Sequence, residues 1–299
     1  MLAVADPLRL LPARPALREF SMPTYGQSHR RMQRLGALGL LAGVFVAGNG
    51  LPAFADESPT PVAKPEAPIT AAPAVDLPAE VDLRPALNEL GLKPRRQGRR
   101  GTCSVFTTAA TFEFALSKRR GESLPLSVEY LNWSCNQITH NRRDVGQFFH
   151  NLLKGYERHG VCLESEMPYT RRFDPELAPS EDAIKSAKQI RELPFEVHWI
   201  KPIGEAPGVT PEQFLEVKRV LAAGWPVAAG ASHSRLFVGY LDDEKEPGGG
   251  VFLTKDSGSG SYRRVTYEFA KTQVNDVFWV DLPELADSKK AESAEAKSP

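Results

Sequence analysis

The hydrophobic pattern in the middle of the chain predicts a series of helices. From Ser104 to about Lys118, apolar residues are interleaved with Thr, Glu and Ala at helical spacing, as in a mostly buried amphipathic helix. Gly98 and Gly101 interrupt the chain just before this segment, and Thr102 is a candidate cap for its first turn. Further helices are predicted at residues 127–132, about 145–159, 181–190 and 211–223.

Residues that favour β-structure dominate the part of the chain that follows. Gly224, Trp225 and Pro226 form a turn signal before the apolar run VAAGAS, which predicts a buried strand. Beyond it, an apolar run, a polar turn and a second β-rich run predict two more strands. His233 opens the first of these and Asp256 closes the second, so the pattern brings both side chains to one end of a sheet.

The N-terminal residues have the pattern of a targeting signal. A basic segment, HRRMQR, precedes an apolar run of about 14 residues, and Ala53-x-Ala55 follows as a cleavage site. The run is shorter than the roughly 18 to 20 residues of a membrane-spanning helix, and it contains several glycines. We therefore expect residues 1–55 to be a signal peptide, with Met22 and Met32 as alternative starts.

This signal predicts export, to the periplasm or out of the cell, and a mature form without membrane attachment. Residues 56–76 are rich in Pro, Ala and Glu, which predicts an extended disordered linker. Residues 285–299 are charged and Ala-rich without apolar periodicity, which predicts a disordered tail. The remaining segment, 77–284, is long enough for one large domain or two closely packed lobes.

Composition and charge exclude several classes of function. With 41% apolar residues and a formal net charge of zero, the chain has the composition of a soluble globular protein. Its arginine pairs are scattered and balanced by acidic residues, so we expect no nucleic-acid partner. His140, His150 and His159 lack metal-ligand spacing, and Gly248–Gly250 lack the Lys and Ser/Thr of a phosphate-binding loop. We expect neither a metal nor a cofactor.

Cys103 is the candidate nucleophile. It begins the predicted helix, where backbone N–H groups and the helix dipole favour a thiolate. Lowering a thiol pKa from about 8.5 to that of an activated cysteine takes about 5 kcal/mol, whereas a helix end supplies about 0.3 to 1 kcal/mol. A cationic partner is therefore needed, and among the six histidines only His233 lies in a distinctive context. Gln97 is a nearby candidate donor for an oxyanion.

These segments resemble the papain family of cysteine peptidases. QGRRGTCS, residues 97–104, matches the family's nucleophile pattern in spacing, and His233, Val238, Gly239 and Tyr240 match its histidine pattern. The order along the chain, cysteine before histidine before a third polar residue, agrees as well. The resemblance covers roughly residues 77–281 and includes the segments LPAEVDLRP, LSVEYLNWSCNQ and GVCLESEMPY.

The resemblance implies an α+β fold with a helical lobe, a barrel-like lobe and an active-site cleft between them. It also implies a monomer that hydrolyses peptide bonds of peptide or protein substrates through an acyl-thioester. Cys103 would be the nucleophile, His233 its imidazolium partner and Gln97 an oxyanion donor, while Asp256 stands where the family has Asn. Gly146 falls at a position that contacts the substrate backbone.

Some positions depart from the family pattern. Ser104 and Gly258 replace tryptophans, so we expect the pair of His233 and Asp256 to be more exposed to water. The alternative function is therefore a catalytically silent papain-fold module that binds peptides or proteins in the same cleft. Acyl transfer to an amine from the same thioester is a third interpretation.

The three cysteines suggest one free thiol and one bridge in an oxidising compartment. With Cys103 free, Cys135 and Cys162 form the candidate disulfide. Cys135 matches a half-cystine of the family, whereas Cys162 does not lie where its usual partner does. Arg100 replaces the cysteine that the family has three residues before the nucleophile. Two buried free thiols are the alternative to this bridge.

Overall fold

The computed structural model describes residues 76–283 of the 299-residue chain. The predicted signal peptide, the linker up to residue 75 and the C-terminal tail lie outside the described residues. Between residues 76 and 283, no helix has both the length and the apolar run that crossing a bilayer requires.

The described part of the chain has an α+β organisation, with most helices first and most strands last. The helices are α1 (Arg84–Glu89), α2 (Cys103–Arg120), α3 (Val128–Thr139), α4 (Phe149–His159), α5 (Glu181–Arg191), α6 (Pro211–Ala222) and α7 (Tyr267–Gln273). The strands are β1 (Glu80–Asp82), β2 (Glu196–Lys201), β3 (Val227–Gly230), β4 (Arg235–Asp242), β5 (Gly250–Asp256), β6 (Ser261–Thr266) and β7 (Asp276–Asp281).

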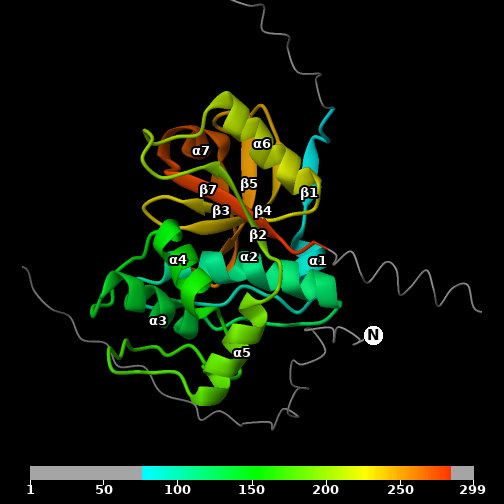
Figure 1. Ribbon diagram of the computed structural model, residues 1–299. Coiled ribbons are helices and arrows are strands. Elements are labelled where there is room, and N and C mark those ends of the chain that lie inside the picture. The colour runs from blue at the N-terminus through cyan, green and yellow to red at the C-terminus, as the bar shows by residue number, and fades with distance from the viewer. Residues whose placement is uncertain (1–75, 284–299) are drawn as a thin grey trace, which may run out of the picture. The chain divides into compact units, whose positions relative to one another are not determined.

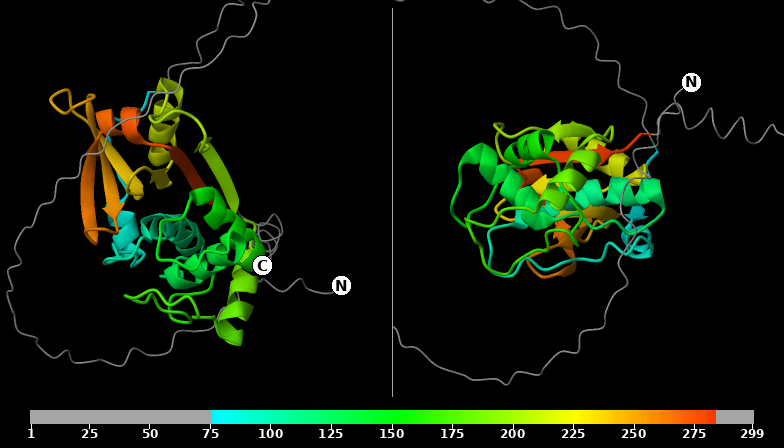
Figure 2. Two further views of the ribbon diagram at one scale, coloured as in Figure 1. Left: turned by 90° about the vertical axis from the view of Figure 1, so that its left-hand side faces the viewer. Right: turned by 60° about the horizontal axis from the view of Figure 1, so that its bottom comes forward.

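These elements form two lobes, as the sequence predicted. In Figure 1, α2 to α5 lie together in the lower part of the picture, and the strands lie above them with α6 and α7. The side view in Figure 2 shows the same separation. All strand pairs are antiparallel in the order β2-β7-β3-β4-β5-β6, and β1 also pairs with β4.

The central helix α2 is buried between the two lobes. Every residue from Ser104 to Ser117 is buried. The Phe112 ring packs against Tyr156 of α4 with ring centroids 4.4 Å apart, whereas Phe114 belongs to a cluster with residues of β4. The predicted helix is confirmed, but it lacks the exposed polar face of an amphipathic helix because it has protein on both sides.

The boundaries of the other predicted helices hold in part. The helices α5 and α6 begin at the predicted residues, and α3 continues to Thr139 instead of ending near residue 132. The predicted start of α4 near residue 145 is wrong, because α4 begins at Phe149. Val145 and Gly146 instead pass against Gly101, where an added Cβ would lie 3.0 Å from the Val145 carbonyl carbon.

Gly239 and Tyr240 attach the first described residues to the sheet. Gly239 has a φ of +152°, and an added Cβ would lie 2.1 Å from the Val81 carbonyl oxygen. Only glycine therefore lets β1 approach β4 this closely. The Tyr240 hydroxyl donates a hydrogen bond of 2.9 Å to the carbonyl oxygen of Pro78.

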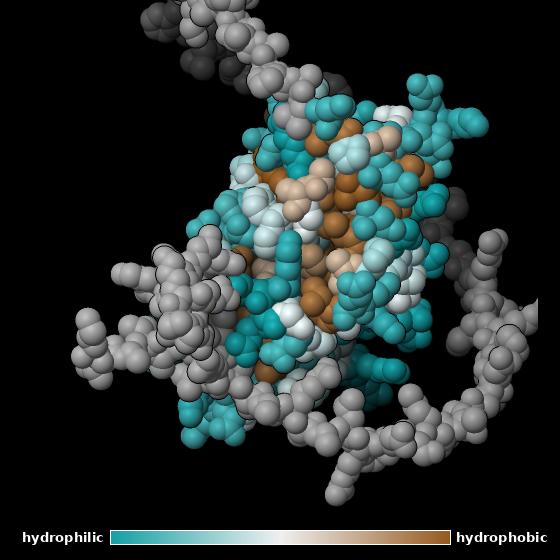
Figure 3. All heavy atoms as spheres, turned by 90° about the vertical axis from the view of Figure 1, so that its right-hand side faces the viewer, coloured by the Kyte–Doolittle hydropathy of each residue, from teal (hydrophilic) through white to brown (hydrophobic). Residues whose placement is uncertain are grey.

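Large hydrophobic side chains are exposed at few described positions. On the face shown in Figure 3, hydrophobic residues form a short central band with hydrophilic residues on both sides. The two most exposed large hydrophobic residues, Val145 at 48% and Phe148 at 57%, lie on either side of Gly146 in the chain. An apolar surface therefore adjoins the residue expected to contact a substrate backbone.

A buried ionic cluster joins α2 to the sheet. The Glu113 carboxylate on α2 is 1% exposed, contacts Arg95 and accepts a hydrogen bond from the Leu126 N–H at 3.0 Å. Its second oxygen lies 3.6 Å from the ammonium of Lys255, which is also buried and directly precedes Asp256. Burial lowers the pKa of Lys255, and the charge of Glu113 opposes this effect. The cluster thereby links the helix that begins with Cys103 to the end of β5.

Glu113→Gln is expected to destabilise the protein by about 3 to 5 kcal/mol, because it removes the negative partner of two cations in a buried site. Urea unfolding followed by circular dichroism measures this change. Glu122→Gln is the matched control, because Glu122 is 56% exposed and its pairing with Arg120 should contribute less than about 1 kcal/mol. Equal stabilities of the two variants would contradict the structural role of the cluster.

Candidate active site

Cys103 is the first residue of α2 and is a free, half-buried thiol. Thr102 occupies the cap position, but its hydroxyl forms a hydrogen bond with the Tyr169 hydroxyl at 2.7 Å and does not cap the helix. The first N–H groups of α2 thus lack a side-chain cap, and they lie where the helix dipole favours a negative charge.

Hydrogen bonds and charge around Cys103 favour its thiolate. Burial would raise the pKa of the thiol, but His233 and the backbone N–H groups of Ser234 and Ser104 lower it, and the net change is downward. For His233, the hydrogen bond to Cys103 raises the pKa of the imidazole, burial lowers it, and the net change is upward. Both changes favour a thiolate paired with an imidazolium.

The structure brings His233 and Asp256 together at one end of the sheet. The strands β4 and β5 are antiparallel neighbours, with Leu236 paired to Lys255, so the residues before β4 meet the end of β5. His233 Nε2 lies 2.9 Å from Asp256 Oδ2. This contact leaves Nδ1 of the imidazole for the Cys103 thiol.

The Asp256 carboxylate has further donors. Its Oδ1 accepts a hydrogen bond from the Ser259 N–H at 2.7 Å, and Arg235 Nε lies 3.2 Å from Oδ2. Burial raises the pKa of Asp256, but Ser259 and His233 lower it, and the net change is downward. Neither Arg235 nor Ser259 was predicted from the sequence pattern. Arg235 begins β4 two residues after His233, which lies in the bend before that strand, so its nearness to His233 in the chain is the signal that could have identified it.

Both ends of the Gln97 side-chain amide are held. Its Oε1 accepts a hydrogen bond from the Ser257 hydroxyl at 2.7 Å, and its Nε2 donates one to the Arg100 carbonyl oxygen at 2.8 Å. The Gln97 N–H also bonds to the Ser257 carbonyl oxygen at 2.9 Å. Because Ser257 follows Asp256, these bonds connect the segment before Cys103 to the end of β5. The second N–H of the amide remains for a ligand.

Gly146 lies beside the loop that leads into α2. An added Cβ at Gly101 would be 3.1 Å from the Gly146 backbone nitrogen, which places the two backbones in close contact. Gly146 itself is exposed. Its backbone is therefore open to solvent, and it lies against Gly101, which precedes Cys103 by two residues.

Arg100 forms a buried ionic contact three residues before Cys103. Its side chain is 2% exposed, its Nη1 lies 2.5 Å from Glu129 Oε2, and its Nε lies 3.4 Å from Asp144 Oδ1. Asp144 precedes Gly146 by two residues. A guanidinium thus connects the segment just before Cys103 to the loop of Gly146, at the position where the papain family pattern has a cysteine.

Gly258 adds no side chain over the pair of His233 and Asp256. It is exposed, and an added Cβ would lie 3.2 Å from His233 Nε2 and 3.4 Å from Asp256 Oδ1. Position 258 is therefore in direct contact with the pair, as expected for a residue that replaces a covering tryptophan. Ser104 is buried, and its hydroxyl has no hydrogen-bond partner within residues 76–283.

The candidate disulfide between Cys135 and Cys162 is absent, and both residues are free thiols. Cys135 on α3 packs toward α4, where an added Cβ at Gly155 would lie 2.8 Å from the Cys135 nitrogen. Cys162 belongs to a different hydrophobic cluster, with Tyr130 and Met167. The two side chains therefore face different parts of the helical lobe.

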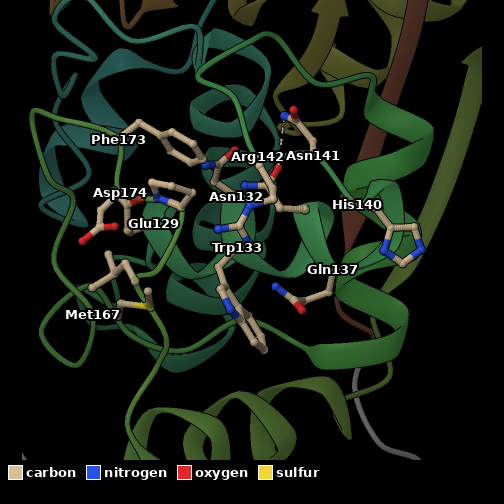
Figure 4. Close-up of a pocket in the computed structure, with 13 residues that line it drawn as sticks. Glu129, Asn132, Trp133, Gln137, His140, Asn141, Arg142, Met167, Phe173 and Asp174 are labelled. Atoms are coloured by element: carbon tan, nitrogen blue, oxygen red, sulfur yellow. Dashed lines mark hydrogen bonds between the residues drawn. The ribbon is translucent and has the colours of Figure 1, made fainter.

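A separate pocket lies in the helical lobe. It has a volume of about 180 Å³, and α3 and the segment 167–177 form its walls. Figure 4 shows Asn132, Trp133 and Gln137 of α3 beside Arg142 and Phe173. Cys103, His233, Asp256 and Gln97 do not line it. The pocket is thus distinct from the polar cluster at the start of α2.

One group of side chains has the donor atoms of a metal site. The ligand atoms of Glu196, His198 and Asp281 lie within 4.8 Å of one another on β2 and β7. His198 Nε2 contacts Asp281 Oδ1 at 3.1 Å, and its ring stacks on Trp279. This trio was not predicted from the sequence, because its members come from two strands far apart in the chain. It lies toward the β2 edge of the sheet, whereas Asp256 ends β5.

Comparisons with solved structures identify the fold. No family model matches the chain, and no curated protein matches it. Xylellain, a cysteine protease from Xylella fastidiosa, matches with a TM-score of 0.54 and 20% identity, over 70% of this chain and 87% of that protein.

Two further structures give the same result. Procathepsin L 3 of the Tenebrio molitor larval midgut matches with a TM-score of 0.52 and 18% identity, over 70% of this chain and 72% of that one. The proform of Amb a 11, a cysteine protease and ragweed pollen allergen, matches with a TM-score of 0.53 and 18% identity, over 72% and 69%. The chain therefore has a papain-like, two-lobe α+β fold.

In the native protein, iodoacetamide is expected to modify Cys103 alone near neutral pH. Burial raises the pKa of Cys135 to about 12, and it also raises the pKa of Cys162, so both remain protonated and shielded. Unfolding without a reductant should then expose all three thiols to the reagent, which peptide mass mapping detects. Native modification of Cys135 or Cys162, or their protection after unfolding, would contradict this assignment.

Proposed function

We propose that this protein is an exported cysteine peptidase that cleaves peptide bonds in peptide or protein substrates. The observation that carries this proposal is the 2.9 Å contact between His233 and Asp256 beside Cys103 at the start of α2. A thiol with a lowered pKa, an imidazole with a raised pKa and a carboxylate on the far nitrogen make up the nucleophile, acid–base and orienting groups of a hydrolase.

In the first step, the Cys103 thiolate attacks the carbonyl carbon of the scissile peptide bond, and a C–S bond forms. The carbonyl oxygen takes up the electron pair as an oxyanion, which the free N–H of the Gln97 amide and the backbone N–H of Cys103 stabilise. The His233 imidazolium then gives its proton to the leaving nitrogen, and the C–N bond breaks. The products are an amine and an acyl-thioester on Cys103.

In the second step, water replaces the amine. The neutral imidazole of His233 accepts a proton from water, and the resulting hydroxide attacks the thioester carbonyl carbon. The C–S bond breaks and the acid is released, which restores the thiolate and the imidazolium. The Asp256 carboxylate orients the imidazole through Nε2 in both steps.

The surface near Cys103 suits an extended peptide. The exposed backbone of Gly146 offers hydrogen-bonding groups to a substrate backbone, and the exposed side chains of Val145 and Phe148 offer an apolar surface.

The basic and apolar segments before Ala55 support export of this domain. N-terminal sequencing of the mature protein should begin at Asp56.

A catalytically silent peptide-binding module is the second candidate, and the exposed Gly258 is the observation that favours it. Water near the pair of His233 and Asp256 weakens the electrostatic contribution of each charge. Such a module would bind a peptide in the cleft without forming a thioester. Measured turnover separates the two candidates.

Hydrolysis of a fluorogenic peptide library is expected to disappear in Cys103→Ser and in His233→Ala, because neither variant retains a thiolate–imidazolium pair. A cysteine-directed epoxide should label the unchanged protein stoichiometrically and leave both variants unlabelled. His159→Ala is the matched control, because the His159 ring packs against Trp133 in the helical lobe. Binding of peptides without hydrolysis or labelling would favour the silent module.

Gln97→Ala is expected to lower kcat by about 10²- to 10³-fold, with a smaller change in KM, because its amide would bind the oxyanion more strongly than the substrate carbonyl. Steady-state kinetics on the best library peptide measures both constants. Asn88→Ala removes an amide that contacts Tyr262 instead, and it should leave kcat unchanged. A Gln97→Ala enzyme with normal kcat would exclude the proposed oxyanion site.

A further inference from the structure

Asp256 introduces a charge that an asparagine in this position would not. A thiolate on Cys103 and an imidazolium on His233 cancel each other, so an ionised Asp256 leaves the trio with one net negative charge. The Asp256 side chain is only 8% exposed. An uncompensated charge in such a site is unfavourable, and it also shifts the pKa values of its neighbours.

Arg235 supplies the compensating charge. Its Nε lies 3.2 Å from Asp256 Oδ2, the same oxygen that receives His233 Nε2 at 2.9 Å. Its Nη1 donates a hydrogen bond of 3.0 Å to the carbonyl oxygen of His233, and its guanidinium lies over the Phe269 ring at 5.6 Å. The guanidinium is therefore fixed by a carboxylate, a carbonyl group and an aromatic ring.

We propose that Arg235 is a positioning residue that neutralises Asp256 and holds its carboxylate on the His233 imidazole, which allows an aspartate to serve as the third residue of the site. The thiolate, imidazolium, carboxylate and guanidinium then sum to zero. The expected effect of Arg235 on turnover rests on the proposed function. The expected effect of Arg235 on the ionisation of Cys103 does not.

The charges near His233 and Asp256 determine whether a substitution raises or lowers the pKa values of Cys103 and His233. Within the described residues, the charged side chains recorded in contact with the Asp256 carboxylate are those of His233 and Arg235. Arg96 packs against Gly260, whose N–H donates to the Asp256 carbonyl oxygen. Lys255, the next residue along β5, instead directs its ammonium toward Glu113. The charge of Arg235 lowers the pKa of His233, whereas the charge of Asp256 raises it.

Removing the charge of Arg235 and removing the charge of Asp256 should therefore shift the pKa values of the site in opposite directions. In Arg235→Ala the excess negative charge raises the pKa values of both Cys103 and His233. In Asp256→Asn the excess positive charge lowers both. The double variant is neutral again, so both pKa values should return toward those of the unchanged protein. A purely structural role for Arg235 would not produce this compensation.

The test is the pH dependence of the rate at which iodoacetamide alkylates Cys103, measured in the full chain for the four combinations. The profile should show two steps, one for the ionisation of Cys103 and one for that of His233. We expect both steps to shift to higher pH by about half a unit or more in Arg235→Ala and to lower pH in Asp256→Asn. In the double variant both should return toward their positions in the unchanged protein. For a cleaved peptide, kcat/KM should fall about tenfold in Arg235→Ala. Arg84→Ala, which removes another Arg–Asp pair, is the matched control and should leave the profile unchanged.

An unchanged profile in Arg235→Ala, or a double variant no closer to the unchanged protein than Arg235→Ala, would overturn the inference. Arg235→Gln keeps most of the side chain without its charge, so it replaces Arg235→Ala if that variant does not fold. Alkylation of Cys103 needs no turnover. Charge compensation without hydrolysis would therefore refute the proposed function alone, and hydrolysis without compensation would refute this inference alone.

Discussion

The burial of α2 between the two lobes is the constraint on which the rest of the structure depends. A helix with protein on both sides cannot shift or rotate without opening two interfaces, so its first residue, Cys103, has a fixed position. Glu113 and Lys255 add a charge pair between this helix and the strand that carries Asp256. The cysteine from one lobe and the histidine from the other can therefore meet with little loss of entropy.

Ionic and hydrogen-bonded contacts fix the groups around the start of α2. Arg100 connects the segment just before Cys103 to Asp144 and Glu129, and Arg235 contacts Asp256. Ser257 holds Gln97 in place. The pair of Arg100 and Glu129 is buried, so the loss of either partner would leave a buried charge. Gly258 is the exception, because it leaves one side of the His233 imidazole open.

The meeting of His233 with Asp256 followed from the predicted strands, because strand periodicity depends on local pattern, whereas the two-lobe fold was implied by the resemblance to the papain family. The position of Cys103 followed from the glycines and the apolar run around it. The missed features depend on contacts between distant segments. Residues 145–148 are not helical since they pass against Gly101, and Cys135 and Cys162 face different clusters of the helical lobe.

The most direct test of the account is to detect the acyl-thioester on Cys103. The protein is mixed with a cleavable peptide, quenched in acid within milliseconds and analysed by mass spectrometry of its proteolytic fragments. The fragment containing Cys103 is expected to gain the mass of the acyl part of the substrate, and this adduct should be absent in His233→Ala. Hydrolysis without any adduct on Cys103, or an adduct on another residue, would contradict it.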